Sequence, residues 1–158
     1  MPPAFYAAAS ANLYTLFQGL APRGILDMSR TAPTEVTSSP RSATLRRNLL
    51  ELHRAIVALE RAAYERRVGN VNAAQFLHVL IEEEAYAWLR PLSALIVQMD
   101  EESEAPQAAE AALFAEARAL IRPDFVGTPF QQRYAWLVEQ SPEVAFAHGG
   151  VVQALKAA

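Results

Sequence analysis

The segment from residue 45 to 63 restricts the fold more than any other feature of this chain. Its apolar residues are separated by alternating steps of four and three positions: Leu45, Leu49, Leu52, Ile56, Leu59 and Ala63. This spacing places them along one side of an α-helix and does not fit the two-residue period of a strand. Such a stripe must be covered by other elements, and the chain lacks the alternation and turn signals of a sheet. We therefore predict an all-α fold, an irregular bundle of five to six helices.

The first helix is predicted at about residues 42–68, with Gly69 and Asn70 ending it. Further helices are expected at about 72–83, 85–102, 107–121, from 129, and, as a short element, from 142. Asn72 is the predicted N-cap of the second helix.

Proline and glycine set the remaining boundaries. Pro91 lies inside the apolar pattern of the third helix, so that helix either begins close to Pro91 or kinks there. Thr128 is expected to cap the fifth helix, with Gln131 completing a capping box. Gly149 and Gly150 are expected to end or bend the sixth helix, leaving a last helical turn or two.

Residues 1–40 differ from the rest of the chain. Residues 29–40 are rich in Ser, Thr and Pro, which is typical of a disordered linker. The apolar stretch near the beginning lacks the basic region that precedes the core of a secretory signal. We expect residues 1–40 to be a disordered or over-annotated segment, with Met28 as an alternative start, followed by a helical domain over residues 41–158.

Composition excludes several classes of function. The chain has no cysteine, so disulfides, thiolate nucleophiles and thiolate metal sites are excluded. No apolar run is long enough for a transmembrane helix, and we expect no membrane partner. The net charge is −3, and Tyr64 is the one aromatic residue among the arginines of residues 41–67, which disfavours nucleic acid as a partner.

The charges are unevenly distributed along the chain. Residues 41–67 hold seven arginines and three glutamates, whereas residues 82–116 hold nine acids and one arginine. We expect the acidic part to pack beside the basic helix, with solvated faces and a few surface ion pairs. Docking of an anionic partner on the arginine face is the alternative.

Three histidines lie on different predicted helices: His53, His78 and His148. His78 and Glu82 are one helical turn apart, a spacing similar to one ligand pair of haemerythrin-like diiron bundles. Those bundles need about five histidines, and no Glu-x-x-His sequence of the ferritin type occurs here. We predict a surface pair, no metal site and no cofactor.

His53, Glu60 and Tyr64 are better candidates for a polar site than His78 and Glu82. They share the flank of the apolar stripe, at spacings of seven and four residues. Polar groups at the edge of a core require partners. These three residues therefore predict a hydrogen-bond network that fixes the register of the helix. The alternative is a site for a small ligand or metal. A His–Glu acid–base pair is the third interpretation.

Aromatic residues gather with an arginine in two later segments: Tyr86, Trp88, Arg90, Phe130, Tyr134 and Trp136. Such residues are enriched in interface hot spots and in ligand pockets, and they are also ordinary core residues. We predict Tyr86, Trp88, Arg90, Tyr134 and Trp136 as interface candidates. No residue is predicted to be catalytic, because no serine lies in a nucleophile-elbow sequence or beside a His and an Asp.

Two segments carry a resemblance to known sequences. They are LRRNLLELHRAIVALERAAYE, at residues 45–65, and YAWLRPLSALIV, at residues 86–97. They resemble a group of bacterial all-helical proteins with no established activity, over residues 43–155. The resemblance implies a helical fold and transfers no site residues. The many Ala and Arg residues are typical of a GC-rich bacterial genome.

We therefore expect a non-enzymatic interaction or regulatory protein of the bacterial cytoplasm, with a protein partner or a second copy of itself. The alternative is a bundle that binds a small ligand or metal near His53, Glu60 and Tyr64.

Overall fold

The computed structural model describes residues 39–101 and 107–157 of the chain. Within these ranges it contains six α-helices, one short 3₁₀ helix and no strand, which confirms the predicted all-α class. The expectations for residues 1–40 lie outside the described residues, apart from the last two positions. No helix in the described ranges combines the length and the apolar character of a membrane span.

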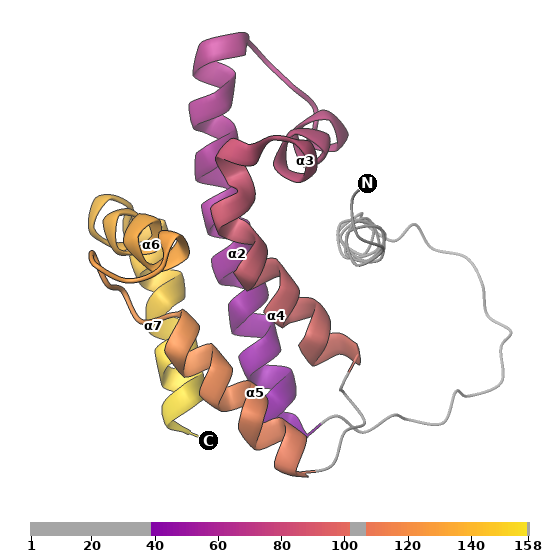
Figure 1. The fold of residues 1–158 in the computed structure, drawn as a ribbon, viewed down its shortest axis with the longest axis vertical. Helices are drawn as coiled ribbons and strands as arrows, with labels where there is room; N and C mark the ends of the chain where they lie inside the picture. The colour runs from indigo at the N-terminus through magenta and orange to yellow at the C-terminus, as the bar shows by residue number, and fades with distance from the viewer. Residues whose placement is uncertain (1–38, 102–106, 158) are drawn as a thin grey trace, which may run out of the picture.

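Helix α2 (Pro40–Val68) is the longest element, and the other elements gather around it (Figure 1). Its 29 residues span roughly 44 Å. Pro40 occupies the first turn, where a missing N–H is tolerated. The helix ends as predicted at Gly69, whose φ of +91° lies in a region that side chains rarely adopt.

The apolar stripe of α2 is buried in its first half as predicted. The fully buried members are Leu45, Leu49, Leu52 and Ile56. Leu59 and Ala63 are only half-buried, and Val57 and Glu60 take the inward positions instead. A repeat of 3.5 residues drifts around a helix that turns every 3.6, so a straight stripe moves away from the core over its length.

Helix α3 (Ala73–Glu82), the 3₁₀ helix η1 (Glu84–Leu89) and helix α4 (Arg90–Glu101) return along α2. Asn72 caps α3 as predicted, in a capping box with Gln75. Of the two alternatives for the third predicted helix, a start close to Pro91 is confirmed, because the α-helix begins at Arg90 and the residues before it form η1. Pro91 then lies in its first turn, where it breaks no hydrogen bond.

Helices α5 (Gln107–Leu120), α6 (Pro129–Gln140) and α7 (Pro142–Lys156) complete the bundle. Thr128 and Gln131 form the predicted capping box of α6. The Oγ of Ser141 accepts a hydrogen bond from the backbone N–H of Val144 and caps α7.

The prediction that Gly149 and Gly150 end the last helix is wrong, because α7 continues through both. It lies antiparallel to the first half of α2 (Figure 1). A Cβ on Gly150 would lie 2.6 Å from Oδ1 of Asn48. The glycine therefore permits a close approach of the two helices, and packing outweighs its low helix propensity.

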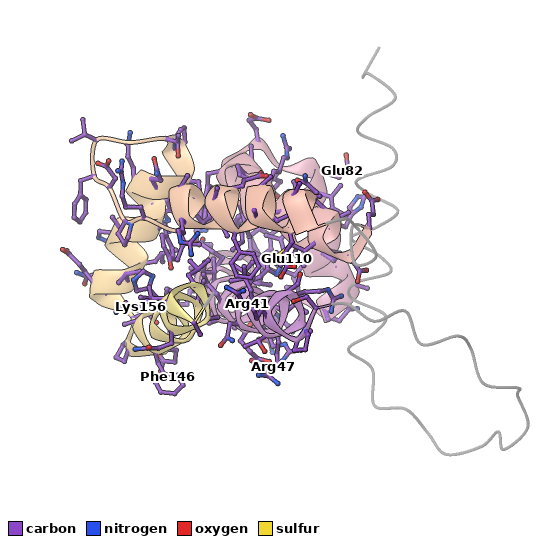
Figure 2. All side chains as sticks on the ribbon, turned by 90° about the horizontal axis from the view of Figure 1, so that it is seen from below. Arg41, Arg47, Glu82, Glu110, Phe146 and Lys156 are labelled. Atoms are coloured by element: carbon purple, nitrogen blue, oxygen red, sulfur yellow. The ribbon has the colours of Figure 1, made fainter. Side chains whose placement is uncertain are left out.

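One continuous core joins these helices. The largest fully buried side chains are Leu45, Leu49, Leu52, Ile56, Phe76, Leu92, Leu95, Ile96, Met99, Phe130, Tyr134 and Leu137. Helix α4, which lies within the acidic segment 82–116, packs against the basic helix α2, as expected. A salt bridge of 2.9 Å joins Arg46 to Asp100. Figure 2 shows Arg47 and Phe146 on the outer side of the α2–α7 pair, away from α5.

Candidate functional site

The three polar residues predicted as one site on α2 have three different partners. His53 Nε2 lies 3.0 Å from Ser93 Oγ on α4. Glu60 binds Arg133 on α6, and the ring of Tyr64 packs at 5.6 Å against Phe76 on α3. These side chains therefore form separate contacts between helices. The structure does not gather them around one ligand.

His53 is held in its neutral form. Burial lowers the pKa of His53 to about 4, because the imidazolium would lose its hydration between α2 and α4. Its neighbour Ser93 is itself buried. The contact is therefore a neutral hydrogen bond that joins the two helices.

Among the described residues, Glu60 is the one acidic residue that is buried, with 6% of its surface exposed. Its Oε1 accepts hydrogen bonds from Nη2 of Arg133 at 2.8 Å and from Nε at 3.3 Å. A carboxylate buried to this extent requires a charged partner, because its desolvation is otherwise uncompensated. The pair connects α2 to α6 across 73 positions of sequence.

Arg133 also lies between two tryptophans. Its guanidinium carbon is 4.7 Å from the ring centre of Trp136 and 5.9 Å from that of Trp88. Both distances permit cation–π attraction. Trp136 is 45% exposed, and the side chain of Arg133 is 41% exposed. One edge of this cluster is therefore open to solvent, although its base is buried.

The open edge continues along α6. Four exposed residues lie within one side of the helix, next to Arg133: Gln132, Trp136, Glu139 and Gln140. We call these five residues the α6 stripe. Gln132 also donates a hydrogen bond to the carbonyl of Gly127, 2.6 Å away, which fixes it at the start of the stripe.

Of the predicted interface residues, the structure brings Trp88 and Trp136 together around Arg133. Tyr86 is buried and packs edge-on against Phe76 at 5.7 Å. Burial raises the pKa of Tyr86, and the charge of Glu60 raises it further. Arg90 is half-buried and lies 3.9 Å from Glu84.

Tyr134 is fully buried, and it stacks on Phe130 at 5.2 Å. Its hydroxyl lies 2.7 Å from Nδ1 of His148. Burial raises the pKa of Tyr134 above its usual range and lowers the pKa of His148. The tyrosine and the imidazole therefore both stay neutral, and one hydrogen bond between the hydroxyl and Nδ1 joins α6 to α7.

Sequence reasoning missed Arg133 and Ser93 as partners. Neither residue belongs to a motif, and the only signal for Arg133 was its place between Phe130 and Trp136. His78 is exposed on α3. Within residues 39–101 and 107–157, no three His, Asp or Glu side chains are grouped as metal ligands.

Comparison with protein-family models finds no match for this chain. Comparisons with curated proteins and with solved structures likewise find no similar protein. The resemblance of residues 43–155 to a group of bacterial helical proteins therefore stays a prediction.

Proposed function

We propose that the protein is a non-enzymatic interaction module, with the α6 stripe as its contact surface and a second copy of the chain as its partner. The observation that supports this most directly is the order of residues in the stripe, which is symmetric about Trp136. Three positions before Trp136 stands Arg133, and three after it stands Glu139. Four before it stands Gln132, and four after it stands Gln140.

This order makes the stripe complementary to itself. In an antiparallel pair of α6 helices related by a two-fold axis at Trp136, positions equally far from the axis face each other. Arg133 of one copy then faces Glu139 of the other, and Gln132 faces Gln140. Each contact occurs twice, with opposite charges or paired amides.

The centre of the stripe has the composition of a binding hot spot. Trp and Arg are the residues most enriched at such centres, and Trp136 supplies the apolar area. Glu60 and Trp88 hold Arg133 from behind, so little side-chain freedom remains to be lost on association.

A single helical stripe is a small interface. It is below the ~1,200–2,000 Å² that stable complexes bury, so the association is expected to be weak and dependent on concentration. The chain contains two tryptophans, which makes a direct test available. The substitution Trp88→Phe leaves Trp136 as the only tryptophan and keeps an aromatic ring beside Arg133.

The proposal predicts that Trp136 emission moves to shorter wavelength between low micromolar and millimolar protein. The mass measured by sedimentation equilibrium should rise over the same range. Glu139→Lys should abolish both changes, because it places two cations opposite each other. Glu82→Lys on α3 makes the same charge change on an exposed residue outside the stripe and should leave both intact. A monomer at every concentration, or equal weakening by the two variants, would contradict the proposal.

A further inference from the structure

A cavity of about 340 Å³ opens between the end of α5, the turn after it and the second half of α7. This volume is within the range of small-molecule pockets. No residue of the α6 stripe lines the cavity, so binding of a ligand there is independent of the proposed self-association.

One wall of the cavity is apolar. Ile121, Val152 and Leu155 line it, and Ile121 and Leu155 also belong to the buried core. This wall suits the hydrocarbon or aromatic part of a ligand.

The charged residues that line the cavity are all cations: Arg118, Arg122 and Lys156. Arg118 donates a hydrogen bond of 2.8 Å to the carbonyl of Leu155 and so fastens α5 to the end of α7. Arg122 pairs with Asp124 at 3.2 Å, and its side chain is 71% exposed. An exposed pair of this kind contributes little stability, so a ligand anion can replace Asp124 as its partner.

Cations are common at helix C-termini, where they offset the helix dipole. This accounts for Arg118 and Lys156 at the ends of α5 and α7. It does not account for Arg122, which lines the same open apolar hollow as these two cations.

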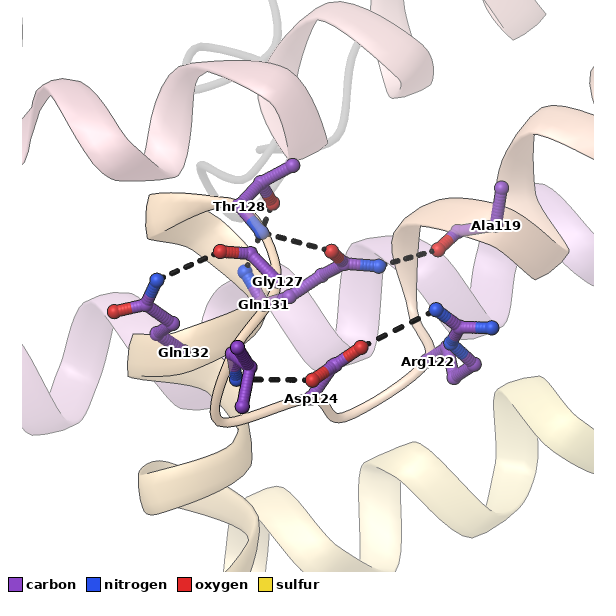
Figure 3. A network of polar contacts seen from close by, with 8 residues as sticks. Ala119, Arg122, Asp124, Gly127, Thr128, Gln131 and Gln132 are labelled. Carbon is purple, nitrogen blue, oxygen red and sulfur yellow. Dashed lines mark hydrogen bonds and ion pairs between the residues drawn. The ribbon is translucent and has the colours of Figure 1, made fainter.

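The wall that carries Arg122 is held in place by hydrogen bonds (Figure 3). Asp124 Oδ1 accepts a hydrogen bond of 2.9 Å from the N–H of Val126. Gln131 accepts one from the N–H of Thr128 and donates another to the carbonyl of Ala119. The turn that carries Arg122 is therefore formed before any ligand arrives, which lowers the entropy lost on binding, and the exposed Arg122 side chain has to exchange Asp124 for the ligand.

His148 also lines the cavity, and its Nδ1 is already engaged with the hydroxyl of Tyr134. The charged side chains that line the cavity thus offer N–H donors and positive charge, and no carboxylate is among the lining residues. A ligand that complements them is negatively charged.

We infer that this cavity binds a small organic anion with an apolar body, of the chemical class of a medium-chain carboxylate. The carboxylate is held by Arg122 and Lys156. The hydrocarbon chain lies against Val152 and Leu155.

Octanoate is the probe for a calorimetric titration of the full chain. Octanol lacks the charge and acetate lacks the apolar body. The inference predicts saturable binding of octanoate, with octanol and acetate each at least about tenfold weaker. Octanol binding as tightly as octanoate would overturn the anion site, and absence of saturable octanoate binding would overturn the cavity as a site.

The double substitution Arg122→Gln and Lys156→Gln should weaken octanoate binding by about tenfold or more. Both residues are exposed, so an unchanged thermal unfolding midpoint will show that the variant folds. The matched control is Arg54→Gln with Arg66→Gln, two exposed arginines of α2 that do not line the cavity. Equal weakening by the two double variants would reduce the effect to net charge and would contradict the inference.

Discussion

Glu60 shows how one side chain links the core to the surface of this protein. Its carboxylate is buried, yet the arginine that neutralises it reaches the solvent beside Trp136. The buried charge therefore fixes the position of an exposed aromatic–arginine cluster. A buried ion pair is weak evidence of stability by itself, but the loss of one partner is costly.

Glu60→Gln keeps the shape of the side chain and removes its charge. We expect the free energy of unfolding to fall by about 1.5–3 kcal/mol, the contribution of a hydrogen bond to a charged group. Glu51→Gln is the control, because Glu51 pairs with Arg54 on the exposed face of the same helix. That change should stay within about 0.5 kcal/mol. Urea unfolding of both variants measures the difference, and equal losses would mean that the Glu60 pair has no special role.

His53 predicts a dependence of stability on pH. Its pKa is about 4 in the folded protein, below the value of 6.5 that is usual for a solvated histidine. As the pH falls from 6.5 towards 4, the imidazole of His53 becomes protonated in the unfolded chain but stays neutral in the folded protein. Stability is therefore lost over this window, by up to about 3 kcal/mol, and the loss levels off below about pH 4.

The measurement compares unfolding free energies at pH 7 and pH 4.5. His53→Gln should flatten the pH dependence, whereas His78→Gln, at an exposed position, should retain it. His148 contributes in the same direction in both variants, because its pKa is also lowered. An identical slope for wild type and His53→Gln would show that the imidazole is not buried as described.

The partners of these residues were beyond the reach of the sequence. Helical spacing correctly placed His53 and Glu60 beside the apolar stripe, because spacing determines the direction of a side chain on its own helix. It carries no information about Ser93 or Arg133, which come 40 and 73 positions later. Long-range contacts arise from the packing of helices, which a local pattern does not encode.

At the scale of elements, local signals predicted most helix boundaries. Asn72 and Thr128 cap their helices as predicted, and Gly69 ends α2. Each of these signals acts through backbone hydrogen bonds of the nearest turn, so neighbouring residues suffice to recognise it. The Gly149–Gly150 pair was misjudged because Gly150 packs against Asn48 on α2, and the local sequence of α7 carries no information about that contact.

The two glycines of α7 form a matched pair for testing this explanation. A Cβ at Gly149 meets no atom within 4 Å, whereas one at Gly150 meets Asn48. We expect Gly149→Ala to raise the free energy of unfolding by about 0.5–1 kcal/mol, the usual gain of alanine within a helix. Gly150→Ala should show no gain or a loss, because Asn48 donates a hydrogen bond to the carbonyl of Thr44 and cannot move freely.

Thermal and urea unfolding of both variants provide the measurement. Adding Asn48→Ala to Gly150→Ala removes the obstructing side chain and should recover part of the gain. If Gly149→Ala and Gly150→Ala are equally stabilising, then α2 and α7 are farther apart than the structure shows.

At the scale of the whole molecule, the acidic and basic segments of the sequence lie on different helices of the bundle. The acids Glu82, Asp100 and Glu110 lie on α3, α4 and α5. Arg47 lies on the outer face of α2, away from α5 (Figure 2). Within the described residues, an ion pair between Arg46 and Asp100 joins the basic helix to the acidic one. Exposed pairs contribute little singly, and α4 itself carries only Asp100 and Glu101 against Arg90, so the packing of α4 on α2 rests mainly on their buried apolar faces.

The antiparallel pairing of α2 with α7 also has a consequence for synthesis on the ribosome. The first described helix to be made packs most extensively on the last. At ~5–20 residues per second, several seconds pass between the emergence of α2 and the completion of Lys156. Throughout that interval the side of α2 around Asn48 lacks its native cover. The bundle can therefore be completed only once α7 has been made, and until then the nascent chain exposes the apolar side of α2 to chaperones.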